Sequence, residues 1–242
     1  MTIVAPVMVD AQRDAWLGLL EVAAKLSAGW CLVGGQMVHL HCWERGFGPN
    51  RPTNDGDAVL DVRGHPSILH DFTRTLTAIG FTSAGPNMSG HEHRWMRGEA
   101  SIDVLIPDGL GDKASSRRGI TGSTTLSTPG AQQAIQRSEL IDVNVAGTRG
   151  QVPRPNLLGA LVVKAAAYGV PADPLRDRHL TDLAVLAAMI RRNDNITIQL
   201  TKRDRDHLAV GIRGLAEHRS LWAGIDGAER GVDLLSAFIK RT

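Results

Sequence analysis

Three aspartates in the first half of the chain are the residues whose types and spacing most clearly predict chemistry. Asp55 and Asp57 are two residues apart, and Asp103 lies within the apolar run 102–106. On a strand, positions i and i+2 point to the same side, and a neighbouring strand can add a third side chain there. Like charges held so close repel one another, so a protein keeps such a trio mainly where a cation neutralises it. Carboxylate oxygens suit Mg²⁺, which combines a few carboxylates with substrate phosphates. The trio therefore predicts metal-assisted chemistry on a nucleotide.

The glycine pair Gly34-Gly35 precedes the aspartates and is a candidate phosphate contact. It follows the short apolar run 30–33 and precedes a segment with helical character. Glycines at such a turn let backbone N–H groups approach a phosphate closely. The alternative is a tight turn without a ligand, because glycine pairs are common turn formers.

The aspartates also have an alternative interpretation. Asn54-Asp55-Gly56 has the composition of an exposed turn. Asp103 is harder to explain in that way, because an unpaired charge inside an apolar strand is costly to bury and needs a partner or a metal. The glycine turn followed by three aspartates in this order favours a functional site.

The elements that must position these residues follow from hydrophobic periodicity. Helical spacing covers residues 10–27, with Asp10 as N-cap, and also residues 36–44 and 66–79. Residues 107–130, rich in Gly, Ser, Thr and Arg, predict a long surface loop or a linker. Short apolar or alternating runs predict strands at residues 30–33, 55–62, 81–82, 93–96, 101–106 and 140–145, with Val152 in a further strand.

The character of the chain changes after Pro155, where four segments in a row have helical periodicity. We therefore expect an α/β domain over residues 1–153 and a helical domain over residues 154–242, with the helices packed as a bundle. The four helical segments are residues 156–168, 176–191, 201–217 and 226–240.

Composition places the chain among ordinary globular proteins. It has 242 residues, of which 43% are hydrophobic and 21% are charged. The two cysteines, Cys31 and Cys42, form no disulfide framework and fit a reducing compartment. We expect a soluble, cytoplasmic protein, because the sequence has neither the basic and apolar start of a secretory signal nor an apolar run long enough for a membrane span. Residues 1–107 carry 8 Lys/Arg and 11 Asp/Glu, and residues 108–242 carry 19 and 14, so the basic second half suits a polyanionic partner.

These motifs together resemble a known superfamily. The order Gly34-Gly35, Arg51-x-Thr53-x-Asp55-x-Asp57 and then Asp103 in a later strand resembles the nucleotidyltransferase superfamily with the polymerase-β-like fold. The later segments 157–167 and 176–183 resemble the helical half of the AbiEii/MenT toxin-type nucleotidyltransferases. The resemblance covers roughly residues 28–190, and it implies an α+β fold with a mixed sheet followed by a helical bundle.

The resemblance also implies roles for individual residues. Asp55, Asp57 and Asp103 would bind Mg²⁺ or Mn²⁺, and Lys164 and Asp182 on two successive helices would complete the catalytic site. The nucleoside triphosphate (NTP) would be held by the glycine pair, Arg51, Thr53 and Lys164. The implied reaction moves an NMP from an NTP to an acceptor hydroxyl at the tRNA 3′ end, and the implied protein is the toxin of a toxin–antitoxin pair.

Several alternatives remain at this point. The acceptor could be a small molecule or a protein, or the chain could be a catalytically weak nucleotide-binding or RNA-binding module. Lys164 could extend to solvent from an apolar helix, and Asp182 could be a surface charge. Gly56 stands between the aspartates where the superfamily usually has an aliphatic residue, and glycine weakens a strand. The histidine pairs 39/41 and 91/93 lack the spacing of a zinc-protease helix and are interpreted as structural or solvated.

Overall fold

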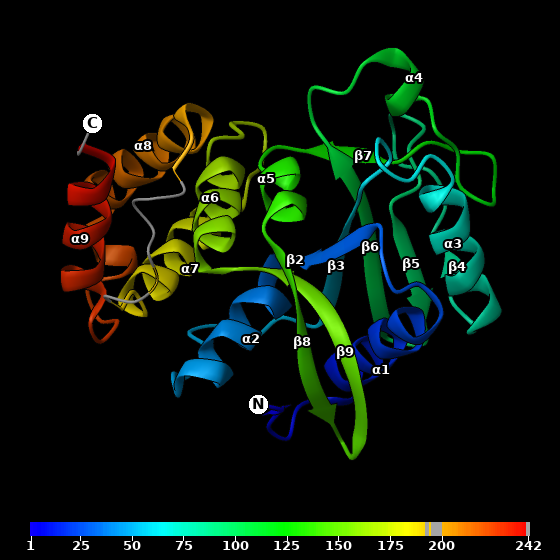
Figure 1. Cartoon of the computed structure of the whole chain (residues 1–242), viewed down its shortest axis with the longest axis horizontal. Helices are drawn as coiled ribbons and strands as arrows, with labels where there is room; N and C mark the ends of the chain where they lie inside the picture. The colour runs from blue at the N-terminus through cyan, green and yellow to red at the C-terminus, as the bar shows by residue number, and fades with distance from the viewer. Residues whose placement is uncertain (192–193, 195–199, 241–242) are drawn as a thin grey trace.

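A mixed sheet lies at the centre of the structure, a computed structural model that describes residues 1–191, 194 and 200–240. Within the described residues, six strands follow the order β2-β3-β6-β5-β4, and β7 pairs with β6. Strands β3 and β6 are parallel, whereas β2 and β5 run antiparallel to them (Figure 1). The strands are β2 (Trp30–Val33), β3 (Asp55–Leu60), β4 (Thr82–Ser83), β5 (Arg94–Arg97), β6 (Ala100–Pro107) and β7 (Leu126–Thr128). The expected α+β fold with a mixed sheet is confirmed.

The two faces of this sheet have different compositions. Strand β3 pairs with β6 in a register that places Asp57 beside Asp103 and Asp55 beside Ser101. Because side chains alternate along a strand, these residues share one face with Val59 and Leu105. The intervening residues of β6 point to the opposite face, which is apolar and buried. Asp103 lies within an apolar run because side chains alternate between two faces of β6: its neighbours in the sequence point to the apolar core, and Asp103 points to the other face.

Helices cover both faces of the sheet. On the apolar face, α1 (Asp10–Lys25) packs against β3, β6 and α3 (Ile68–Ala78). On the other face, the short helix α5 (Ala131–Gln136) contacts β2, β3 and β6. There a small apolar cluster borders the aspartates: Cys31, Val33, Val59, Ala131, Ala134 and Val163. The aspartates therefore lie at the open end of a face whose remainder is covered.

A second sheet joins the start of the chain to its middle. Strand β1 (Ile3–Val4) runs parallel to β8 (Ser138–Val145), which pairs antiparallel with β9 (Thr148–Pro155). The hairpin turn between β8 and β9 consists of Ala146 and Gly147, which both have positive φ. Strand β9 packs against α1 and β2, so this sheet supports the central one.

Among the residues that the structure describes, four α-helices follow β9 and gather on one side of the molecule (Figure 1). They are α6 (Leu157–Tyr168), α7 (Asp177–Ala188), α8 (Lys202–Glu217) and α9 (Ala228–Lys240), with a 3₁₀ turn at Arg219–Leu221 after α8. Asn156 caps α6 by accepting a hydrogen bond from the Gly159 N–H, and Thr201 and Asp204 form a capping box on α8. No helix among the described residues has the length and apolar character that a membrane crossing needs.

The observed helices and strands differ from the predicted ones where contacts between distant segments determine the local structure. Residues 107–130 were expected to be a loop, but they contain α4 (Asp112–Ser115) and β7, which completes its hydrogen bonds on β6. Helix α2 (Gly34–Arg45) begins at the glycine pair instead of after it, and Asp10 is the first helical residue of α1 instead of its N-cap. The division into domains at residue 153 stays a prediction.

Gly56 is explained by the close approach of α1 to the sheet. A Cβ atom at Gly56 would lie 3.0 Å from Leu19 Cδ1 and 3.6 Å from Ile102 Cγ1. The glycine thus faces the apolar core while both neighbouring aspartates face the other way. A branched side chain has no room there, so the missing side chain lets α1 pack directly on β3.

We expect Gly56→Val to destabilise the protein by about 1–3 kcal/mol, because it overfills the contact with Leu19. Urea unfolding measures this change. In the Leu19→Ala background, which lacks the opposing side chain, Gly56→Val should cost less than it does in the wild-type background. Equal costs of Gly56→Val in the two backgrounds would contradict the packing explanation.

Candidate active site

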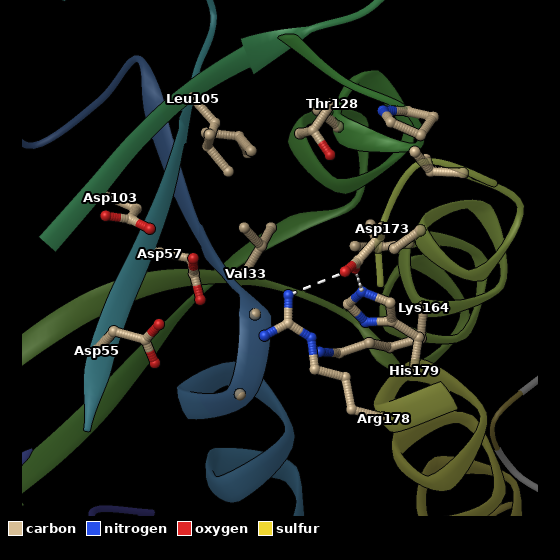
Figure 2. Close-up of a pocket in the computed structure, with 18 of the residues that line it drawn as sticks. Val33, Asp55, Asp57, Asp103, Leu105, Thr128, Lys164, Asp173, Arg178 and His179 are labelled. Carbon is tan, nitrogen blue, oxygen red and sulfur yellow. Dashed lines mark hydrogen bonds and ion pairs between the residues drawn. The ribbon is translucent and has the colours of Figure 1, made fainter. Parts of the chain in front are cut away.

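The three aspartates converge on one point of the central sheet. One carboxylate oxygen from each of Asp55, Asp57 and Asp103 lies within 4.8 Å of one from each of the others. Figure 2 shows the three side chains on the same side of the two strands. Among the described residues, no other group of three or more His, Cys, Asp or Glu residues is arranged to hold a metal ion. We call these three residues the aspartate cluster.

The glycine pair lies directly against the cluster. Gly34 has φ +68°, and a Cβ atom there would be 1.7 Å from Asp57 Oδ2. A Cβ atom at Gly35 would be 2.5 Å from Thr53 Oγ1. Both glycines are therefore required by the close approach of β3 and its preceding loop to the start of α2. The first N–H groups of a helix have no partner within the helix and carry a partial positive charge, so this turn can hold anionic oxygens.

A buried hydrogen-bond network fixes the loop before β3. Gln36 on α2 donates from Nε2 to the Thr53 carbonyl at 3.0 Å, and Trp16 Nε1 donates to Gln36 Oε1 at 2.7 Å. His39 contacts the Arg51 carbonyl through Nε2 at 2.9 Å, and its other ring nitrogen contacts Gln12. Burial lowers the pKa of His39, so the ring is neutral and acts as a structural element.

Thr53 orients the first carboxylate of the cluster. Its hydroxyl donates to Asp55 Oδ1 at 2.7 Å, and its side chain is buried between α2 and β3. A carboxylate has two oxygens, so this bond holds one while the other stays open toward the pocket. Thr53 thereby acts on the geometry of Asp55.

The electrostatics of Asp57 show the cost of placing three carboxylates together. Burial, together with the negative charges of Asp55 and Asp103, raises the pKa of Asp57 to about 7. Lys164 and Arg178 act in the opposite direction and stabilise its charged form. A divalent cation would relieve the same repulsion, so the donor set fits Mg²⁺ or Mn²⁺.

Asp103 has a cation partner within the sheet. Arg94 faces it across the antiparallel pair β5–β6. The guanidinium donates from Nε to Oδ1 at 2.8 Å and from Nη2 to Oδ2 at 2.7 Å. The partner that an aspartate in an apolar run requires is therefore present in the chain.

Lys164 and Arg51 are both held by Asp182. Lys164 Nζ lies 2.7 Å from Asp182 Oδ2, and Arg51 donates to both oxygens of the same carboxylate at 2.9 and 2.8 Å. Burial raises the pKa of Asp182, but Lys164 and Arg51 outweigh it and bring the value to about 2. Lys164 and Arg51 line a pocket between the sheet and the helices, whereas Asp182 is not part of its lining. The structure thus joins these three residues, with Asp182 positioning the two cations.

A cavity of about 350 Å³ lies between the sheet and the helices, and the aspartate cluster forms one wall. Across from it lie Lys164 of α6 and Arg178 and His179 of α7 (Figure 2). Asp173 holds both residues of α7, at 3.4 Å from Arg178 Nη2 and 3.1 Å from His179 Nε2. Apolar side chains complete the lining: Val33, Val59, Leu105, Pro129, Ala131, Val163, Ala167 and Val170. A negative wall facing a positive one suits a metal complex of a polyanion.

Sequence reasoning missed several residues of this site. Arg94, Asp173, Arg178 and His179 reach the pocket only through strand pairing and helix packing. A local signal exists for Arg94 alone, because a meander places a residue of one strand opposite Asp103 on the next. The histidines at 39 and 41 are hydrogen-bonded to the backbone, in line with their structural interpretation.

Comparison with solved structures gives the class of fold. An antigenic nucleotidyltransferase-like protein from Paracoccidioides brasiliensis is similar with a TM-score of 0.53 and 16% identity, over 90% of this chain and 94% of that chain. A solution structure of the antibiotic-resistance factor ANT(2″)-Ia matches 97% of this chain and 94% of its own at 14% identity and a TM-score of 0.40. Its crystal structure with adenylyl-2″-tobramycin matches 95% and 98% at 13% identity and a TM-score of 0.40. No protein-family model and no curated protein sequence matches the chain.

The first similarity shows that the chain has a nucleotidyltransferase-like fold. This is the fold that the resemblance to the nucleotidyltransferase superfamily implied. The narrower resemblance to AbiEii/MenT toxin-type enzymes stays a prediction.

We expect Gly34→Ala to destabilise the protein far more than Gly46→Ala. Both glycines have positive φ, but a Cβ at Gly46 meets nothing within 4 Å. The Gly46 variant thus carries only the conformational penalty of about 1–2 kcal/mol. The Gly34 variant must also displace the Asp57 side chain, so we expect a further loss of about 2 kcal/mol or more in urea unfolding. Equal losses would show that Asp57 moves aside freely.

The pKa of Asp182 predicts a pH dependence of stability. Its folded-state pKa of about 2 lies below the value of about 3.9 in an unfolded chain. The stabilisation is therefore complete above about pH 4 and is lost as the pH falls toward 2. We expect Asp182→Asn to cost about 3–5 kcal/mol near pH 6, because Lys164 is left buried without a counter-ion.

Urea unfolding of wild type and Asp182→Asn between pH 6 and pH 2 checks this expectation. The difference between the two proteins should shrink as the pH falls. Asp142→Asn, on the β8–β9 hairpin away from the pocket, controls for the loss of one carboxylate. A difference for Asp182→Asn that stays constant down to pH 2 would contradict the assignment.

Proposed function

We propose that the protein is a Mg²⁺-dependent or Mn²⁺-dependent nucleotidyltransferase, which moves an NMP from an NTP to an acceptor hydroxyl and releases pyrophosphate. One observation carries the proposal: three carboxylates converge within 4.8 Å at a glycine turn, in a pocket whose opposite wall is cationic. The nucleotidyltransferase-like fold supports it. The balance of negative and positive walls matches a cation bound to a triphosphate.

The cluster supplies the ligands for the metal. Asp55, Asp57 and Asp103 offer hard oxygen donors. Burial, and then the charges of Asp55 and Asp103, raise the pKa of Asp57, and a bound cation would favour its charged form. When bound, the metal supplies positive charge that stabilises the attacking and leaving oxygens. Thr53 keeps one oxygen of Asp55 fixed, which orients the other.

The remaining residues hold the triphosphate. Gly34 and Gly35 line the pocket at the first turn of α2, where N–H groups have no partner within the helix and can donate to phosphate oxygens. Lys164 and Arg178 place positive charge on the opposite side, and Asp182 and Asp173 keep these cations in position. The triphosphate would thus lie between the glycine turn and α6–α7, with its α-phosphorus next to the cluster.

The transfer step is an in-line displacement. The acceptor oxygen forms a bond to the α-phosphorus while the bond from that phosphorus to the bridging oxygen breaks, and pyrophosphate leaves with the electron pair. The hydroxyl proton passes to a carboxylate, a role that we assign to Asp103. The residues of the pocket keep the acceptor oxygen in line with the bond that breaks, and the apolar lining limits access of water.

For the acceptor we propose the 3′ end of tRNA, with a growth-inhibiting role opposed by an antitoxin. The resemblance of segments 157–167 and 176–183 to toxin-type enzymes supports this choice. The excess of Lys and Arg after residue 107 also suits an RNA partner. Small molecules and proteins are the competing acceptor classes.

The experiment incubates the protein with each α-³²P-labelled NTP, Mg²⁺, and separate tRNA, protein and small-molecule fractions. We expect label in the tRNA fraction, lowered by roughly a hundredfold or more in Asp55→Asn and in Asp57→Asn. Asp142→Asn serves as the matched control, because it lies on the β8–β9 hairpin away from the pocket. Transfer that survives both cluster variants would refute the metal assignment, and label in another fraction would replace tRNA as the acceptor.

A further inference from the structure

Arg94 occupies a position that a metal ion would compete for. Its guanidinium takes both oxygens of Asp103 in a side-on pair, at 2.8 and 2.7 Å. This pairing occupies a lone pair on each carboxylate oxygen, and a metal ion at Asp103 would need the same oxygens. The metal-free cluster is therefore already partly neutralised, at Asp103, by a residue of the chain.

The two partners of this pair differ in their freedom to move. The Asp103 side chain is 11% exposed on a central strand, whereas the Arg94 side chain is 46% exposed on β5. The aspartate is held by the sheet, and the arginine reaches it from the solvent side. A change in the pair would therefore move the arginine and leave the aspartate in place.

The charge of Arg94 acts on the whole cluster. Its pairing with Asp103, and then the charges of Asp55 and Asp57, raise the pKa of Arg94. A guanidinium so placed repels a divalent cation at the same carboxylates. Lys164 and Arg51 act on the cluster only at longer range, because the carboxylate that they contact is Asp182, outside the cluster.

We propose that Arg94 is an exchangeable counter-ion of the cluster, which leaves Asp103 for the triphosphate when a metal–nucleotide complex binds. The inference rests on the proposed function and adds to it a coupling between metal binding and nucleotide binding. Arg94 lines the same pocket as the glycine turn, so its planar guanidinium can pair with phosphate oxygens as it pairs with Asp103. Metal alone must displace Arg94 into solvent, whereas a metal–nucleotide complex offers it a new anionic partner. Metal binding thereby depends on the nucleotide.

The test compares Arg94→Met with Arg97→Met in Mn²⁺ binding, measured by electron paramagnetic resonance. Both arginines are on β5, but Arg97 contacts Glu21, the Ile79 carbonyl and the Phe81 ring, away from the pocket. Without nucleotide, we expect Arg94→Met to bind Mn²⁺ on the order of tenfold more tightly than wild type. A non-hydrolysable NTP analogue should then raise Mn²⁺ affinity less in Arg94→Met than in wild type. Arg97→Met should match wild type in both measurements.

Two additions keep the test decisive: Arg94→Lys separates the effect of charge from that of the two-bond pairing, and circular dichroism shows whether each variant is folded. Lysine retains the charge but loses the two-bond pairing, so its Mn²⁺ affinity should fall between wild type and the methionine variant. A folded Arg94→Met protein whose Mn²⁺ affinity is equal to or weaker than that of wild type would overturn the proposal. If Arg94→Met binds Mn²⁺ more tightly while wild type transfers no nucleotide to any acceptor, the counter-ion role stands and the proposed function is rejected. If wild type transfers nucleotide while Arg94→Met has the same Mn²⁺ affinity as wild type, the proposed function stands and the counter-ion role is rejected.

Discussion

Repulsion among three carboxylates on one sheet face is the interaction on which the rest of the site depends. The parallel pairing of β3 with β6 makes the approach unavoidable, because it sets Asp57 beside Asp103. Each surrounding cation offsets part of that repulsion from a different direction: Arg94 from the sheet, and Lys164 and Arg178 from the helices. The helices are therefore more than a lid on the sheet. They bring the charge that lets the sheet carry its cluster.

The cations around the pocket are held in two ways. Some are fixed by a buried carboxylate outside the cluster, and one pairs with the cluster itself. Asp182 is buried and joins Lys164 to Arg51, which ties α6 and α7 to the loop before β3. Removing Asp182 would leave Lys164 buried without a counter-ion, so this group is part of the fixed frame of the site. Arg94 instead contacts the cluster directly and is half exposed. A site built in this manner keeps a fixed frame around one movable charge.

The sequence was most informative where local pattern and chemistry coincide. Alternation on a strand was enough to place Asp55 and Asp57 on one face, and the apolar run around Asp103 indicated that this aspartate has a partner. The register of β3 against β6 and the pairing of β7 with β6 could not be derived, because both depend on contacts between distant segments. The same limit hid Arg178, which reaches the pocket from α7. Gly56 looked like a weakness until the position of Leu19 showed that it faces the core.

Asp182, whose carboxylate Lys164 and Arg51 share, comes late in the chain, and its position has a consequence during synthesis. A ribosome completes both sheets, the glycine turn and the whole aspartate cluster by residue 155, before Lys164, Arg178 or Asp182 exists in the chain. At that length the chain contains Arg94 and its partner Asp103, but it lacks the carboxylate that pairs with Arg51. Most of the positive charge that faces the cluster is therefore made after the cluster itself. The pocket can reach its final electrostatic balance only after α7 has been synthesised and Asp182 can pair with Lys164 and Arg51.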